Sequence, residues 1–179
     1  MKIGIYGGSF NPVHNSHLML ANFAKHELKL DKIFFIPSNV TPGKEGTLID
    51  GRIRHDMIFN ALIESDYLGF VSDYEINKPG ISYTIDTIKF FKEHYPEDEL
   101  FLICGPDVIT NFHSWKNHIE LEQLINVSIA NRDFHCPDVM IRSTLIRDLI
   151  KKGYPISHLV PKSVEKFIDQ HKLYQGENN

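Results

Sequence analysis

The chain has 179 residues, a formal net charge of −4, and 42% hydrophobic with 23% charged residues. This size and composition are typical of one globular domain that buries its own core. The acidic balance argues against broad, nonspecific binding to nucleic acid, which needs an excess of Lys and Arg. No apolar run approaches the roughly 20 residues of a membrane-spanning helix. We therefore expect neither a nucleic-acid nor a membrane partner.

The two cysteines, Cys104 and Cys136, lack the spacing of a metal site. Cys104 ends an apolar run, so we expect it to be a buried thiol. Unpaired cysteines and the lack of an apolar leader at the N-terminus favour a reducing compartment. We expect a cytoplasmic protein. The sequence leaves the oligomeric state open, and a homo-oligomer is compatible with it.

Short apolar runs alternate with longer amphipathic stretches along the chain. We predict strands over residues 2–6, 32–37, 68–74, 99–105 and 126–132. We predict helices over residues 16–30, 51–65 (capped by Asp50), 84–95, 118–125, 142–153 (from a Ser cap to a Gly stop) and 161–174 (Pro161 at its start). This alternation predicts an α/β fold, a Rossmann-like doubly wound parallel sheet of about five strands with helices on both faces. We expect one domain over 1–179, with 142–174 as a C-terminal helical part.

The stretch IYGGSFNPVHNSHL (5–18) lies at the carboxyl end of the first predicted strand, where such sheets bind ligands. Gly7 and Gly8 are expected to allow a sharp turn and leave backbone N–H groups uncovered. A helix that begins near Asn15 or Ser16 would point its free N–H groups at the same space. The stretch therefore predicts an anion site, although Gly-Gly after a strand is more often only a turn.

His14 and His17 lie three residues apart in the first turn of that helix, so both imidazoles can face the anion site. The spacing also fits a metal ion, but no third ligand is near in sequence. A single His on a helix is more often a surface or core residue. The spacing of the stretch matches neither a Walker A loop nor a GxGxxG loop.

The same stretch closely resembles the signature G-[ST]-F-[DN]-P-x-H-x-G-H-L of the nucleotidyltransferase superfamily. Segments that resemble its bacterial nicotinate-nucleotide adenylyltransferase branch follow in order: IPSNVTPGKEG, GISYTIDTI, CGPDVITNFHSWK, IRSTLIRDLIKKG and HLVPKSVEKFIDQHKLY. The resemblance implies transfer of AMP from ATP to nicotinate mononucleotide, with release of pyrophosphate and formation of deamido-NAD. The acceptor phosphate is already ionised at neutral pH. The reaction therefore needs no general base, and catalysis rests on positioning and charge stabilisation.

The resemblance implies three catalytic side chains and a set of ATP contacts. The catalytic side chains would be His14 and His17, at the phosphates and the transition state, and Arg147, whose guanidinium suits phosphate oxygens. The ATP contacts would be Gly7, Gly8, Ser9, Phe10, Asp107, Ser143 and Thr144. Taken alone, RSTLIR is only a capped amphipathic helix, and Asp107 is equally well explained as a helix cap. Mg²⁺ would be carried with ATP, because it keeps waters and uses few protein ligands.

For the mononucleotide, the resemblance implies a second set of contacts: Lys44, Tyr83, Thr84, Trp115 and Arg132. Trp115 is the only Trp and would stack on the pyridine ring. The N–H groups at Tyr83 and Thr84 would receive the nicotinate carboxylate. Lys44 would hold the phosphate, and Arg132 would contact a phosphate or the adenine side. The structural alternatives are a core Trp, a packed Tyr83 and a solvated Lys44.

The chain departs from the family pattern at three positions: Ser16 replaces the glycine of H-x-G-H, Gly43 replaces a histidine, and Arg142 replaces a serine. These changes leave open the preference for nicotinate or nicotinamide mononucleotide and the rate of turnover. The alternative from another class is a nucleotide-binding sensor with weak catalysis, with Ser16 as the lesion. Pantetheine-phosphate transfer fits SYTIDT and the C-terminal helix poorly, and a purely structural module leaves two anion sites unexplained.

Overall fold

In this computed structural model the described residues are 1–43, 45–105, 111–129 and 141–176. Five strands form one parallel sheet in the order β3-β2-β1-β4-β5, as predicted for a doubly wound fold. The strands are β1 (Lys2–Gly8), β2 (Lys32–Pro37), β3 (Phe70–Val71), β4 (Glu99–Cys104) and β5 (Asn126–Ile129). Strand β1 is the central strand, because it pairs in parallel with β2 on one side and β4 on the other.

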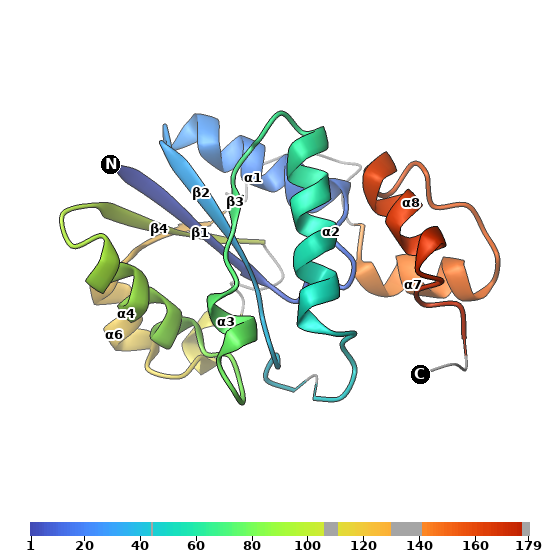
Figure 1. Cartoon of the computed structure of the whole chain (residues 1–179). Coiled ribbons are helices and arrows are strands. Elements are labelled where there is room, and N and C mark those ends of the chain that lie inside the picture. The colour runs from blue at the N-terminus through green and yellow to red at the C-terminus, as the bar shows by residue number, and fades with distance from the viewer. Residues whose placement is uncertain (44, 106–110, 130–140, 177–179) are drawn as a thin grey trace.

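Helices cover both faces of the sheet (Figure 1). They are α1 (Asn15–Glu27), α2 (Gly51–Glu64), α3 (Tyr74–Asn77), α4 (Thr84–His94), α6 (His118–Leu124), α7 (Ser143–Lys151) and α8 (Lys162–Gln170), with a 3₁₀ turn η1 (Phe112–Ser114). Helices α1, α2 and α8 contribute to one apolar cluster, and α4 and α6 contribute to the other. Within the described residues, no helix is long and apolar enough to cross a membrane.

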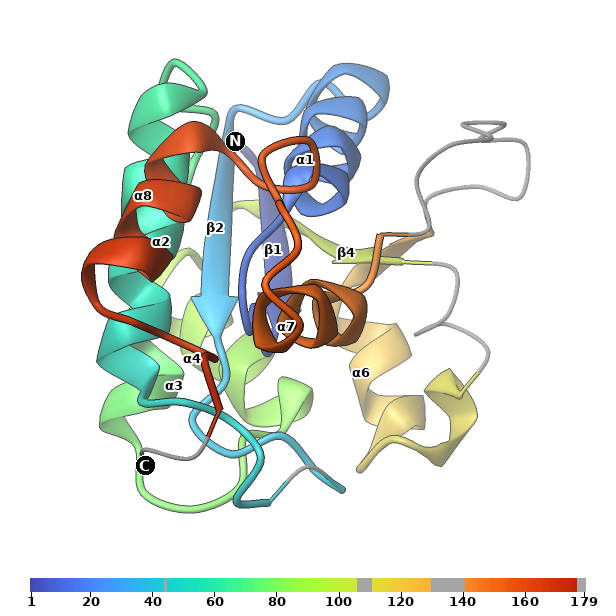
Figure 2. The same ribbon diagram turned by 90° about the vertical axis from the view of Figure 1, so that its right-hand side faces the viewer.

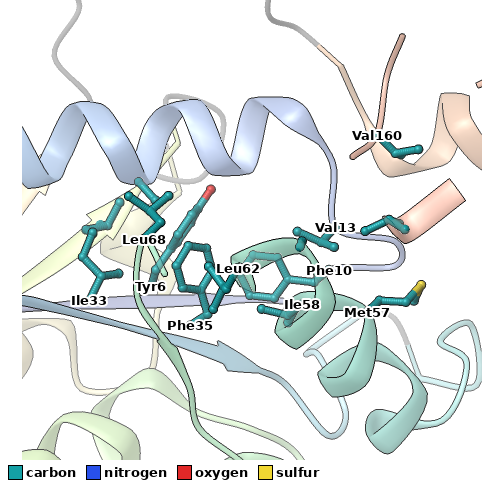
Figure 3. Close-up of a cluster of buried hydrophobic side chains, with 14 of the residues drawn as sticks. Tyr6, Phe10, Val13, Ile33, Phe35, Met57, Ile58, Leu62, Leu68 and Val160 are labelled. Carbon is teal, nitrogen blue, oxygen red and sulfur yellow. The ribbon is translucent and has the colours of Figure 1, made fainter. Parts of the chain in front are cut away.

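Side-chain alternation along the strands divides the core into these two layers. In β2, Ile33 and Phe35 face the α1–α2 layer, whereas Ile36 faces the α4–α6 layer. Figure 3 shows Phe35 packed among Tyr6, Phe10 and side chains of α2. Each central strand is therefore apolar on both faces, which explains its nearly continuous hydrophobic sequence.

The C-terminal helices bring the end of the chain back to the first strand. Helix α8 lies beside α2, and α7 lies near the segment that follows β1 (Figure 2). The N–H groups of Lys162 and Ser163 both donate to the Glu64 carboxylate, at 3.1 and 2.7 Å. Those hydrogen bonds hold the pKa of Glu64 below its usual value. Glu64 therefore caps a helix that begins almost a hundred residues later in the sequence.

Three predictions about these elements were wrong in detail. The strand predicted over 68–74 is reduced to Phe70–Val71, and the short helix α3 follows because Asp73 and Asn77 bond to each other there. Arg142, not a serine, occupies the cap position of α7, since the Ser143 hydroxyl is used elsewhere. The helix predicted over 161–174 ends at Gln170, while Pro161 lies at its start as predicted, as the cap residue of α8. The Asp50 cap of α2 is confirmed, because its carboxylate accepts from the Arg52 N–H at 2.7 Å.

Candidate active site

The segment after β1 turns later than the glycines suggest. Gly7 and Gly8 belong to β1, in register with Ile36 and Pro37, and neither has a positive φ. The left-handed residue is Phe10, with φ 42°, and its side chain is only 1% exposed. The phenyl ring packs in the core, so the side chain of Phe10 does not face a ligand. A Cβ on Gly7 would meet no atom within 4 Å, so the strand end there is open.

The two histidines lie together at the beginning of α1, as predicted. Their ring centroids are 3.6 Å apart, and the ring planes are nearly parallel. The backbone N–H of His14 donates to Nδ1 of His17 at 3.2 Å. This bond places the proton of a neutral His17 on Nε2, which remains a donor. The ring of His17 is also fixed by an edge contact with Phe10, at 4.9 Å between centroids.

Burial keeps both imidazoles neutral near pH 7. His14 is 4% exposed, and desolvation lowers its pKa to about 4. Desolvation lowers the pKa of His17 well below its usual value, and the charge of a protonated His14 would lower it further. Nδ1 of His14 is buried and has no hydrogen-bond partner among the described residues. With His14 buried and His17 half-buried, the pair is a neutral polar surface with unused hydrogen-bonding capacity.

Helix α7 contacts the chain immediately before these histidines. The Ser143 hydroxyl donates to the Pro12 carbonyl at 2.8 Å, and Arg147 Nη1 donates to the Asn11 carbonyl at 2.6 Å. The two side chains lie on one face of α7, as their spacing predicts. Thr144 is exposed at the beginning of the same helix. The structure thus brings the hydroxyl of Ser143 and the guanidinium of Arg147 to the loop that leads into His14.

Asn11 joins four segments at this loop, and sequence reasoning missed it. It is 1% exposed, its amide accepts a hydrogen bond from the Tyr174 hydroxyl at 2.8 Å, and its carbonyl receives Arg147. Its Nδ2 donates to the Thr47 carbonyl at 3.4 Å. Arg54 was missed as well. Arg54 lies one turn before Met57 and Ile58, on the apolar face of α2. Its place among apolar residues at helical spacing is the sequence signal that could have predicted a buried charge.

The residues predicted for the pyridine ring lie at the edge of the α4–α6 layer. Tyr83 and Trp115 are half-buried and pack against the same apolar cluster. Lys116 Nζ lies 4.2 Å from the centroid of the Tyr83 ring, so these two segments are in direct contact. Tyr83 precedes the first residue of α4, Thr84, and its backbone therefore begins that helix.

The predictions for Lys44, Asp107 and Arg132 fall outside the described residues, as does Cys136. Cys104 is a buried free thiol, as expected, and burial raises its pKa to about 12.

The side chains around the histidines suit phosphate oxygens better than a resident metal ion. In the described parts of the chain, no group of three or more His, Cys, Asp or Glu side chains could hold a metal. The groups gathered near β1 are imidazoles, hydroxyls and a guanidinium. Such groups donate hydrogen bonds to oxyanions, whereas Mg²⁺ needs oxygen ligands.

Comparison with known proteins agrees with this chemistry. A model of the Cytidylyltransferase-like family matches residues 5–151. A curated protein of Shouchella clausii (strain KSM-K16), named "Probable nicotinate-nucleotide adenylyltransferase", is 38% identical over 191 residues, covering 99% of this chain and 98% of that protein.

Solved structures share the fold. A candidate nicotinate-nucleotide adenylyltransferase of Vibrio parahaemolyticus has a TM-score of 0.81 and 22% identity, covering 99% of this chain and 96% of that one. The Plasmodium falciparum nicotinic acid mononucleotide adenylyltransferase, complexed with NaAD, has a TM-score of 0.78 and 20% identity, covering 97% of each chain. On the family model and the full-length relative, the chain belongs to the nicotinate-nucleotide adenylyltransferases of the Cytidylyltransferase-like family.

Proposed function

We propose that this chain transfers AMP from ATP to nicotinate mononucleotide, forming deamido-NAD and releasing pyrophosphate. The observation that carries the proposal is the stacked and neutral pair His14 and His17, at the beginning of α1 beside the loop that Arg147 contacts. The acceptor phosphate attacks the α-phosphorus of ATP, and the bond to the β-phosphate oxygen breaks. The acceptor phosphate is already an anion, so no side chain has to remove a proton.

Charge stabilisation is the work of the ATP half of the site. Nε2–H of His17 donates to an oxygen of the α-phosphate, where negative charge grows as the new bond forms. Because His14 is buried and His17 is half-buried, each hydrogen bond to that charge is stronger than it would be in solvent. The first backbone N–H groups of α1 add the positive end of a helix dipole.

Arg147 and the residues at the beginning of α7 hold the departing pyrophosphate in this proposal. The guanidinium now donates one bond to Asn11, and its remaining donors suit the β- and γ-phosphate oxygens. Ser143 and Thr144 contribute N–H groups at the first turn of α7. Mg²⁺ is proposed to enter with ATP, neutralising the triphosphate while its other ligands stay water or phosphate.

The mononucleotide half recognises a flat ring and a carboxylate. The face of Trp115 stacks on the pyridine, and the N–H groups of Tyr83 and Thr84 at the beginning of α4 receive the carboxylate. Lys116 adds a positive charge beside Tyr83. A carboxylate gains from that charge and a carboxamide does not, which favours nicotinate over nicotinamide mononucleotide.

The deciding experiment measures pyrophosphate release from MgATP with nicotinate and nicotinamide mononucleotide supplied separately at equal concentrations. A strong preference for the nicotinate form is expected. A preference for the nicotinamide form would keep the chemistry and reverse the substrate. If ATP binds but neither acceptor releases pyrophosphate, the sensor alternative replaces the enzyme, with Ser16 as the first residue to revert to glycine.

A further inference from the structure

Arg54 is the largest fully buried side chain in the described part of the chain, with 1% of its surface exposed. It donates to the carbonyls of Ile49, Ser9 and Ser38, at 2.9, 2.8 and 2.6 Å. Among the described residues it has no carboxylate within ion-pair distance. Burying a charge is costly unless its donors are satisfied. The three carbonyls offset that cost for Arg54, and Arg54 in return holds the three backbone segments together.

Two of those carbonyls belong to the ends of neighbouring strands. Ser9 directly follows β1, and Ser38 directly follows β2. The Ser38 N–H also donates to the Gly8 carbonyl at 3.0 Å, which extends the pairing of the two strands to their last residues. Ligands bind in such sheets where the strands end and the following loops separate. Arg54 therefore holds the loop that leads to His14 at a fixed distance from the loop after β2.

Glu75, in α3, is a second buried charge, 7% exposed. Its carboxylate accepts from the Thr87 hydroxyl at 2.5 Å. Thr87 lies in the first turn of α4, and its N–H donates to the Tyr83 carbonyl at 3.4 Å. Glu75 therefore fixes the turn with which α4 begins. Next to this turn, the Ser82 hydroxyl oxygen accepts from the Asn39 N–H at 2.9 Å.

The two networks meet at neighbouring residues. Arg54 donates to the Ser38 carbonyl. The next residue is Asn39, whose backbone N–H donates to the Ser82 hydroxyl. The Asn39 side chain donates to the Lys78 carbonyl at 2.9 Å. The Ser82 N–H donates to the Val40 carbonyl at 2.9 Å. A continuous polar path thus runs from the loop after β1, across residues 38–40, to the beginning of α4.

We propose that Arg54 and Glu75 are positioning residues that hold the ATP half and the mononucleotide half of the site in register, with Ser38 and Asn39 as the joint between them. This inference rests on the proposed function, which assigns ATP to one segment and the mononucleotide to the other. Neither side chain touches substrate in this proposal. Glu75 acts through Thr87 on the mononucleotide half, and Arg54 acts on both halves.

The test measures the dissociation constants of nicotinate mononucleotide and MgATP separately by calorimetry, in which no turnover occurs. Glu75→Gln is expected to weaken mononucleotide binding about tenfold or more and ATP binding less than about threefold, because it loses charged hydrogen bonds only on the mononucleotide side. Arg54→Lys keeps the charge but cannot span three carbonyls, so it is expected to weaken both ligands by similar factors.

Two further variants separate positioning from general stability. Thr87→Val removes the hydroxyl that binds Glu75 and keeps the shape of the side chain at residue 87. It is expected to weaken mononucleotide binding more than ATP binding, as Glu75→Gln does, but by a smaller factor. Glu64→Gln is the matched control, because it removes a carboxylate with a structural role at α8 and is expected to change neither constant. A folded Thr87→Val chain with unchanged mononucleotide affinity overturns the proposal, even if Glu75→Gln fails to fold. Equal weakening of both ligands in Glu75→Gln also overturns it.

The wild-type chain distinguishes this inference from the proposed function. Wild type that binds the mononucleotide but releases no pyrophosphate contradicts the proposed reaction only, and the split in Glu75→Gln still decides the positioning role. Wild type that does not bind the mononucleotide contradicts both.

Discussion

The proposed ATP half and the proposed mononucleotide half of the candidate site are built in opposite ways. On the ATP half, His14 is 4% exposed, stacks on His17, and lies beside a loop that residues from α7 and the C-terminus hold by hydrogen bonds. On the mononucleotide half, Tyr83 and Trp115 are half-buried at the rim of a core layer, with Lys116 over the Tyr83 ring.

This difference follows from what each half has to do. Charge that grows in a transition state is best stabilised by donors already fixed in a dry setting, since no reorganisation is then needed. A flat ring is recognised by an aromatic face that is open before the ligand arrives. We therefore expect changes on the ATP half to lower kcat and changes on the mononucleotide half to raise KM.

The largest expected effect is on the ATP half. His17→Ala is expected to lower kcat about 10² or more, as for loss of a donor aimed at developing charge. The KM for nicotinate mononucleotide should change little. Steady-state pyrophosphate release measures both constants. His26→Ala, an exposed histidine further along α1, is the matched control. A near-normal kcat in His17→Ala would remove His17 from the mechanism.

The dryness of the ATP half can be tested by pH. The pKa of His14 is lowered to about 4, below its unfolded value of 6.5, so the unfolded chain binds more protons between these values. The stability contributed by neutral His14 is complete above about pH 6.5 and is lost as the pH falls toward 4. Between pH 7 and pH 5 the loss is about 2 kcal/mol.

Urea unfolding of the wild type and of His14→Gln at both pH values measures this loss. The free energy of unfolding should fall less in the variant, because glutamine does not titrate and every other group is shared. Equal slopes in the two proteins would mean that His14 is solvated in the folded chain.

On the mononucleotide half, Trp115→Ala is expected to raise the KM for nicotinate mononucleotide about tenfold, in the range of one lost aromatic stack. The kcat should change by less than about threefold. Phe59→Ala, which removes an exposed aromatic ring from α2, is the control. A fall in kcat without a rise in KM would contradict the assignment of Trp115 to ring binding.

The smallest expected effect concerns the docking of the C-terminal helices that support the ATP half. Glu64→Gln weakens the cap on α8 and is expected to lower the stability by about 0.5 kcal/mol, a small value because Glu64 is exposed. Its pKa is lowered in the folded chain, so this contribution is present at neutral pH and is lost as the pH falls through the carboxyl range. Thermal unfolding at pH 7 and pH 4 measures it, with Glu122→Gln as control. If Glu64→Gln lowered the stability more at pH 4 than at pH 7, the predicted pH dependence would be wrong.

The sequence by itself determined the doubly wound sheet, because apolar strands and amphipathic helices alternate with short connections. It also determined the position of His14 and His17 at the carboxyl end of β1. That order is local, and periodicity of 2 or 3.6 residues reports it directly. The strand predicted over 68–74 is shorter than expected and the helix α3 escaped prediction, because hydrogen bonds of Asp73 and Asn77 outweighed the apolar pattern there.

Only the tertiary structure decided which distant residues meet. Sequence spacing cannot show that Tyr174 binds Asn11, or that Arg54 reaches the ends of two strands. The family resemblance implied Phe10 as an ATP contact, whereas its ring packs in the core. These outcomes depend on long-range burial and on satisfying buried polar groups, which are properties of the folded chain and not of any segment in it.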